Sequence, residues 1–348
     1  MEAHFPLLVP AILALIDDES LPFKVRGCSL LSMFLTPLKE GGSDILQRTN
    51  LSSVFEDALV PCLLFIPTIT PEDESLQLLG AAYPALLSVL RIRYQNLSSK
   101  DIKGQKIASS STGVPPSQTT RDIYIRHVAN ILRINLIPSI HHISSTVVEE
   151  NSVIASFPFP RLSTFLLEQI NILLPELGIH ATKYLQEIIP PICTALANPF
   201  GPAHPPLLLA AVAAARSVVL NAHPRIWRWR GELLGALCDC WFHVIDEEDQ
   251  LLAEQAKKPT PATSPDQEEL DRLASMQRLR KQLKGVVYLL KVAVTSVMET
   301  NKVVEENWVG LDEEIHLENE LTDLVAADER LRELLFAEAL PGDKDYGL

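Results

Sequence analysis

Cysteine and histidine side chains near residue 240 are the first candidates for chemistry in this sequence, because thiolate and imidazole groups are common zinc ligands. Cys238, Cys240 and His243 lie close together in the chain. On a helix, a two-residue step is a rotation of about 200°, so the two thiols point to opposite sides and cannot hold one ion together. We interpret them as core cysteines, and His141 and His142 fail as ligands for a similar reason. We expect no metal site and no cofactor.

Asp17 and Asp18 could be proposed as a pair of catalytic carboxylates. A structural role explains them as well, because short carboxylates accept backbone N–H groups in a turn. Lys24 or Arg26 would be their partners, and with Gly27 these residues form the structural turn motif that we favour. No GxSxG, Walker-type or HExxH pattern is present, and the 14 glycines form no phosphate-binding cluster. The sequence therefore predicts a protein that is not an enzyme.

One basic cluster is interleaved with aromatic residues, and it comprises Arg225, Trp227, Arg228, Trp229 and Arg230. Such residues can stack on single-stranded nucleic acid and contact its phosphates. They can also anchor a protein interface, where Trp and Arg are enriched. In a third interpretation they pack internally, with the arginines paired to acidic residues of the C-terminal tail. The cluster is the candidate partner-binding site of this chain.

The elements that must position these residues are helices. Residues 4–38 predict two helices joined by a short turn, because apolar side chains recur at three- and four-residue steps. The predicted buried positions are Phe5, Leu8, Ile12, Leu13 and Ile16, followed by Val25, Leu30, Leu31, Phe34, Leu35 and Leu38. A proline in the first helix, an Asp turn and Val25-Arg26 opening the second helix are typical of a HEAT repeat. We therefore predict an all-α fold, an α-solenoid of HEAT-like helical repeats.

A pattern of two aliphatic residues followed by proline supports the repeat. It occurs at Pro10, Pro61, Pro138 and Pro190, at spacings of 51, 77 and 52 residues. Two spacings are slightly longer than the ~40 to 47 residues of typical HEAT units. The longest spacing contains a polar insertion.

The composition along the chain predicts five segments. They are N-terminal HEAT-like repeats (1–97), a disordered loop (98–120), central HEAT-like repeats (121–253), a linker (254–267) and C-terminal helices with an acidic tail (268–348). Residues 147–160 are a weaker helical patch, whereas residues 206–220 are apolar nearly all round and predict a central helix. Ser264-Pro265-Asp266-Gln267 is typical of a capping box. The amphipathic acidic tail is expected to pack.

Composition and charge exclude several classes of protein. The 348 residues are 47% apolar and 21% charged, so the chain can bury a substantial core. Residues 299–348 hold 15 acidic and 4 basic residues, which accounts for −11 of the net charge of −14 and leaves a nearly neutral body. This balance argues against a broad nucleic-acid-binding surface.

The cellular compartment can also be inferred from the sequence. Five scattered cysteines indicate a reducing compartment rather than a disulfide framework. The first residues lack a positive region and a cleavage motif, so no secretory signal is expected. The most apolar run, residues 205–215, is shorter than the ~20 residues that a membrane-spanning helix needs. We expect no membrane association.

Three stretches together resemble a known family. The run PAILALIDDESLPFKVRGCSLLSMFL, the later run PRIWRWRGELLGALCDCW and the ending LVAADERLRELLF are similar, in that order, to the family of Tel-two-interacting protein two. Members of that family usually carry helices before the Asp-Asp repeat, whereas this chain begins inside it. An uncapped solenoid end is therefore expected.

The resemblance implies a non-enzymatic scaffold of the TTT complex, with Tel-two and Tel-two-interacting protein one as partners. That complex acts with the heat-shock chaperone in the maturation and stability of phosphatidylinositol-3-kinase-related kinases. Cytoplasmic and nuclear localisation and a link to checkpoint and telomere control would follow. Two alternatives share the repeat features: a general α-solenoid adaptor of the transport or phosphatase-scaffold type, and a nucleic-acid-binding repeat protein.

Overall fold

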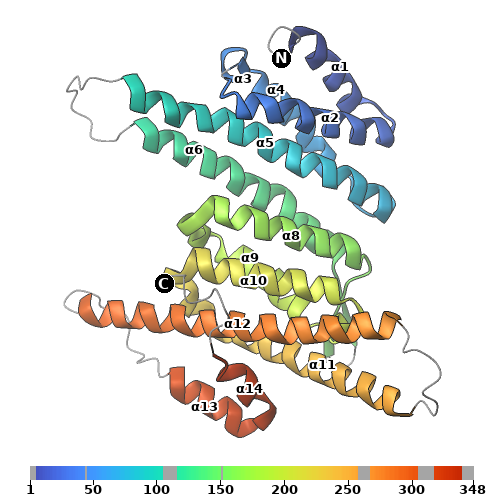
Figure 1. The fold of residues 1–348 in the computed structure, drawn as a ribbon, viewed down its shortest axis with the longest axis vertical. Coiled ribbons are helices and arrows are strands. Elements are labelled where there is room, and N and C mark those ends of the chain that lie inside the picture. Colours follow the sequence, from blue (N-terminus) through green and yellow to red (C-terminus); the bar gives the residue numbers. More distant parts are fainter. Residues whose placement is uncertain are drawn as a thin grey trace. The chain divides into compact units, whose positions relative to one another are not determined.

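The computed structural model describes residues 5–43, 45–104, 116–149, 152–257, 267–304 and 317–338. The chain divides into two compact units, Met1–Ser139 and Ile140–Leu348, here called unit 1 and unit 2. Nearly every element in the described residues is helical (Figure 1). This confirms the predicted all-α class.

Unit 1 is built around one long helix, α5. Its elements are α1 (Phe5–Asp17), α2 (Leu21–Glu40), α3 (Ile45–Arg48), α4 (Leu51–Leu59), the 3₁₀ turn η2 (Val60–Leu64), α5 (Glu72–Gly104), α6 (Pro116–Asn130), the π-helical turn η3 (Ile131–Leu136) and the start of α7 (Ile137–Ile143). Helix α2 packs on α1 and on α5, and α5 also packs on α4 and α6 (Figure 1). The unit is therefore a stack of helices in which α5 has neighbours on several sides.

Of the five positions in the predicted buried stripe of α1, three are buried, Leu13 is half-buried and Leu8 is exposed. Phe5, Ile12 and Ile16 are buried, but Leu8 is 40% exposed and Val9 is buried in its place. Because α1 is apolar on nearly every side up to Asp17, periodicity alone does not choose between adjacent stripes. In α2 the buried residues include Leu31, Phe34, Leu35 and Leu38, as predicted, whereas Val25 and Leu30 are half-buried.

Unit 2 is organised around α10, which packs on α8, α9 and α12 (Figure 1). Its elements are the end of α7, β1 (Ser145–Glu149), β2 (Ser152–Ser156), α8 (Pro160–Leu177), η4 (Gly178–Lys183), α9 (Leu185–Leu196), η5 (Gly201–Ala203), α10 (Pro205–Ile226), η6 (Trp227–Trp229), α11 (Arg230–Lys257), α12 (Gln267–Val304), α13 (Leu317–Ala327), η7 (Glu329–Leu331) and α14 (Arg332–Leu335). The central position predicted for residues 206–220 is confirmed.

The helical patch predicted for residues 147–160 is wrong. Strands β1 and β2 form an antiparallel hairpin in which Ser145 lies opposite Ser156 and Glu149 lies opposite Ser152. The strands contain the β-branched residues Val147, Val148, Val153 and Ile154. Such residues lose rotamer freedom in a helix and favour extended backbone. Helical structure resumes at Pro160 in α8.

The structure also differs from the predicted loop at residues 98–120. Helix α5 continues to Gly104 and α6 begins at Pro116, so both ends of this segment are helical. No proline or glycine interrupts residues 95–103, and a polar helix still satisfies its backbone hydrogen bonds internally. Residues 105–115 lie outside the described residues. The same holds for most of the predicted linker and for Ser264–Asp266 of the capping box, although α12 does begin at Gln267.

Three helical segments form longer apolar stretches than residues 205–215, the run expected to be the most apolar. Glu72–Tyr94, Pro160–Lys183 and Pro205–Glu254 are long and apolar enough to cross a membrane by length and composition. Half or more of each apolar window is buried inside the structure. Neighbouring helices therefore cover much of this apolar surface.

Candidate protein-binding surfaces

The Asp turn between α1 and α2 has the geometry of a structural motif. The backbone N–H of Ser20 donates to Asp18 Oδ1 at 2.8 Å, which closes the turn. Lys24 was predicted to pair with a carboxylate of this turn. Instead its Nζ donates to the main-chain oxygen of Ile16 at 3.0 Å and lies 5.5 Å from the centre of the Phe65 ring. A lysine at the end of a helix stabilises carbonyls that have no intrahelical partner.

Gly27 of the same motif is required by the packing of α1 on α2. A β-carbon at this position would lie 2.8 Å from the Ile16 nitrogen and 3.0 Å from the Leu15 carbonyl carbon. Both atoms belong to the backbone of α1, so they cannot move aside as a side chain could. Arg26, the other predicted partner of the Asp turn, is exposed and makes no ion pair with Asp17 or Asp18 within the part of the chain that the structure describes. The motif thus sets how closely the first two helices approach.

The Arg and Trp cluster lies where α10 gives way to α11. The backbone of Ala222 leaves the helical conformation there, and Trp227–Trp229 form the 3₁₀ turn η6. Arg225 and Arg228 are exposed, whereas both tryptophans are half-buried. The Arg228 guanidinium lies 5.1 Å from the centre of the Trp227 ring, a cation–π contact that orders an exposed arginine.

Arg230 is set apart from the rest of the cluster because it is paired inside unit 2. Its Nη2 and Nε donate to the two carboxylate oxygens of Glu320 in α13, at 2.8 and 3.2 Å. Its Nη1 also donates to the main-chain oxygen of Trp227 at 3.1 Å. The interpretation in which the cluster pairs with the acidic tail therefore applies to Arg230. Arg225 and Arg228 keep their charges at the surface.

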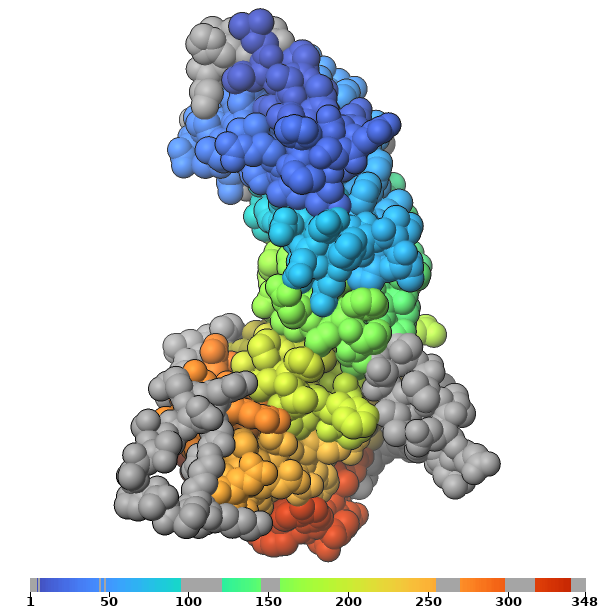
Figure 2. Space-filling model, turned by 90° about the vertical axis from the view of Figure 1, so that its right-hand side faces the viewer, coloured from blue at the N-terminus to red at the C-terminus, as the bar shows by residue number. Residues whose placement is uncertain are grey.

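The C-terminal segment, residues 317–338, packs on α11 and α12 as predicted for the acidic tail. Figure 2 shows this segment, in red, against the orange surface of unit 2. Its buried apolar residues are Leu321, Val325, Leu331, Leu334 and Leu335. The tail is therefore a folded part of unit 2 within the described residues.

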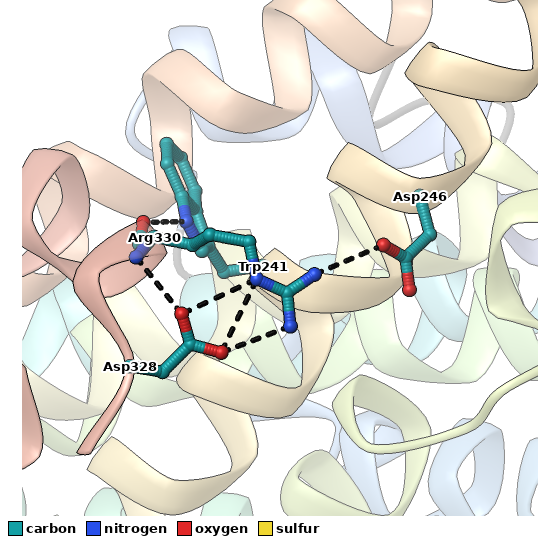
Figure 3. A network of polar contacts seen from close by, with 4 residues as sticks. All are labelled: Trp241, Asp246, Asp328 and Arg330. Atoms are coloured by element: carbon teal, nitrogen blue, oxygen red, sulfur yellow. Dashed lines mark hydrogen bonds and ion pairs between the residues drawn. The ribbon is translucent and has the colours of Figure 1, made fainter.

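Polar contacts attach the C-terminal segment at Trp241, which is fully buried in α11. The indole N–H of Trp241 donates to the main-chain oxygen of Arg330 at 3.0 Å (Figure 3). The Arg330 guanidinium in turn bonds to Asp328 within its own segment and to Asp246 on α11, and it lies 4.6 Å from the centre of the Phe242 ring. These contacts fix the 3₁₀ turn η7 against α11.

A second set of contacts joins the segment to α12. Arg280 donates to Glu248 at 2.7 Å and to Glu333 at 2.6 Å, and Lys284 pairs with the same Glu333. Both cations also lie over the Trp241 ring. The hydrogen bond from Lys284 holds the pKa of Glu333 below its ordinary value, because it stabilises the ionised carboxylate.

The predicted core cysteines are buried in α11. Burial raises the pKa of Cys238 and of Cys240 to about 12, so both thiols are protonated and unreactive at neutral pH. His243 is half-buried on the same helix, whereas His141 and His142 are exposed. Within the described residues, no group of three His, Cys, Asp or Glu side chains could hold a metal ion.

Comparison with known proteins identifies a family. A sequence model of the Tti2 family matches residues 1–203. The chain has no match among curated proteins and none among solved structures. The Asp turn lies inside the matched residues, whereas the Arg and Trp cluster and the C-terminal segment lie beyond them. Because the match covers more than half of the 348 residues, this chain belongs to the Tti2 family.

Proposed function

We propose that this chain is a non-enzymatic scaffold subunit of the TTT complex, with Tel-two and Tel-two-interacting protein one as its partners. The observation that carries the proposal is the match of residues 1–203 to the Tti2 family, which supports a role in that complex. Acting with the heat-shock chaperone, the complex would bring phosphatidylinositol-3-kinase-related kinases to their mature, stable form. Residence in the cytoplasm and nucleus, and effects on checkpoint and telomere control, would follow.

The helical architecture is compatible with a scaffold. Helices α1, α2, α5 and α6 of unit 1 pack on one another in chain order, as α8, α10 and α12 do in unit 2. We infer that these layers are HEAT-like units of an α-solenoid, a fold that offers an extended surface to other proteins.

The exposed part of the Arg and Trp cluster is our candidate contact with a partner. Arg225 and Arg228 carry charge at the surface beside two half-buried tryptophans, and these residue types commonly anchor protein interfaces. Arg230 is left out of this surface, because its guanidinium already pairs with Glu320.

Purification of the tagged chain from cells tests the proposal. Mass spectrometry should recover Tel-two and Tel-two-interacting protein one at near-equal amounts, and removal of the chain should shorten the lifetime of the client kinases. Recovery of transport cargo or phosphatase subunits without those two proteins would overturn the assignment in favour of a general adaptor.

A further inference from the structure

A pocket of about 200 Å³ opens in unit 1 between η2 and η3. Apolar side chains from three elements line it: Val60 from η2, Leu86 and Leu90 from α5, and Ile131 and Ile134 from η3. Leu86 and Leu90 are buried and form the floor, whereas Val60 and Ile134 are exposed and form the rim. For comparison, an apolar cavity of about 150 Å³ accommodates a benzene ring. The pocket therefore has room for one aromatic side chain.

The π-helical turn that forms one wall has a cause in the sequence. Pro138 has no N–H to donate to Ile134, and its ring would clash with the carbonyl of that residue in a regular helix. The helix widens just before it, and the Ile137 N–H donates to the Leu132 carbonyl five residues back. Such π turns often occur at functional sites. Here the turn includes Ile131, Ile134 and Asn135, all of which line the pocket.

Glu56 from α4 supplies a fixed acceptor in the wall. Arg93 Nη1 lies 2.7 Å from one carboxylate oxygen and His127 Nδ1 lies 3.4 Å from the other. Burial alone would raise the pKa of Glu56, but the hydrogen bonds from His127 and Arg93 hold it below its ordinary value. Glu56 is therefore ionised at neutral pH. Its side chain is 14% exposed, and it lines the pocket.

Asn135 is the residue that points to a ligand. It is only 7% exposed and lines the pocket, and its side-chain amide has no hydrogen-bond partner among the residues that the structure describes. Its amide atoms are not among the described side-chain atoms that are fully buried without a partner, so they reach the solvent of the pocket that Asn135 lines. A ligand that displaces this solvent must replace its hydrogen bonds, because an unpaired polar group without water costs free energy. This amide offers an N–H donor and a carbonyl acceptor to whatever enters the pocket.

We propose that this pocket binds a tyrosine side chain presented by a partner protein. The ring would pack against Leu86, Leu90 and Ile131, and the phenol would both donate and accept hydrogen bonds at Asn135 and Glu56. Phenylalanine and leucine would displace water from the Asn135 amide without replacing its hydrogen bonds, and they have no O–H to donate to Glu56. Tryptophan donates but does not accept, so the Asn135 N–H groups would stay unpaired. Tyrosine is also enriched at protein interfaces, because it combines an apolar ring with a polar end.

The pocket is tested with the full chain and two probes that differ only in the phenolic oxygen, N-acetyl-tyrosinamide and N-acetyl-phenylalaninamide. Methyl NMR of the leucine and isoleucine side chains would report binding. We expect shifts at Leu86, Leu90 and Ile131 in the millimolar range, with about tenfold tighter binding of the tyrosine probe. No binding, or equal binding of both probes, would overturn the proposal.

Two variants test which residues of the pocket bind the probes. Asn135→Leu should remove the preference for tyrosine, and Ile134→Asp should weaken both probes. Met33→Asp is the control, because Met33 is 69% exposed and Ile134 66%, and Met33 does not line the pocket. A preference for tyrosine that survives Asn135→Leu would also overturn the proposal. The test uses no TTT component, so its outcome is independent of the function proposed above.

Discussion

The indole N–H of Trp241 donates to the main-chain oxygen of Arg330, and this hydrogen bond joins two residues 89 positions apart in the chain. It ties the C-terminal segment to a fully buried side chain of α11. Trp241→Phe keeps most of the ring but removes the donor, so the partly buried Arg330 carbonyl loses this partner. We expect a loss of about 1–2 kcal/mol in the free energy of unfolding, measured with urea.

Hydrogen exchange would show where the Trp241→Phe effect acts. The amides of residues 331–335 should exchange faster in the variant, because the segment opens more often. Trp229→Phe is the control, since the Trp229 indole N–H has no partner among the described residues. Equal effects of the two changes would show that the Arg330 contact does not hold the segment.

Replacing Gly27 and replacing Gly80 with alanine should have opposite effects on stability. Gly27→Ala forces a β-carbon against the α1 backbone and should cost about 1–3 kcal/mol. Gly80→Ala in α5 meets no atom within 4 Å and should gain about 0.5–1 kcal/mol, because alanine favours the helix. Thermal unfolding would measure both shifts. A neutral Gly27→Ala would show that α1 and α2 do not approach this closely in solution.

Glu56 should make stability depend on pH in the acid range. Its pKa is lower in the folded chain, so its contribution is present above the unfolded pKa of about 4.3 and is lost as the pH falls through the folded pKa. The urea midpoint should therefore drop by more between pH 5 and pH 3 in the wild type than in Glu56→Gln. Asp57→Asn, at an exposed neighbour, should keep the wild-type difference.

The candidate partner surface predicts an effect of charge reversal. Arg225→Glu with Arg228→Glu should reduce recovery of the TTT partners about tenfold or more, because arginines at the centre of an interface often dominate its affinity. Arg278→Glu with Lys281→Glu reverses two exposed charges on α12 and serves as the control. Unchanged recovery with the first pair would remove this surface from the proposal.

The sequence by itself determined the helical class, the central place of α10 and the packing of the tail. These follow from local patterns whose apolar side chains must be covered by other parts of the protein. The patterns are apolar residues at steps of three and four, a helix that is apolar all round, and leucines within an acidic run. It also marked Asp18 as a turn residue, because a short carboxylate closes a turn with its own neighbours. It missed the hairpin at residues 145–156, where β-branched residues favoured strands over the weak helical period.

Only the tertiary structure decided which distant residues meet. Arg230 and Glu320 are 90 positions apart, and nothing in either local pattern selects one acidic residue of the tail from the others. Likewise, nothing in the sequence marks Asn135, and its place in the pocket lining depends on the π-helical turn before Pro138 and on the packing of that turn beside Leu86 and Leu90. Local patterns fix which faces must be buried, because burial is non-directional. The geometry of individual polar contacts depends on how whole helices pack.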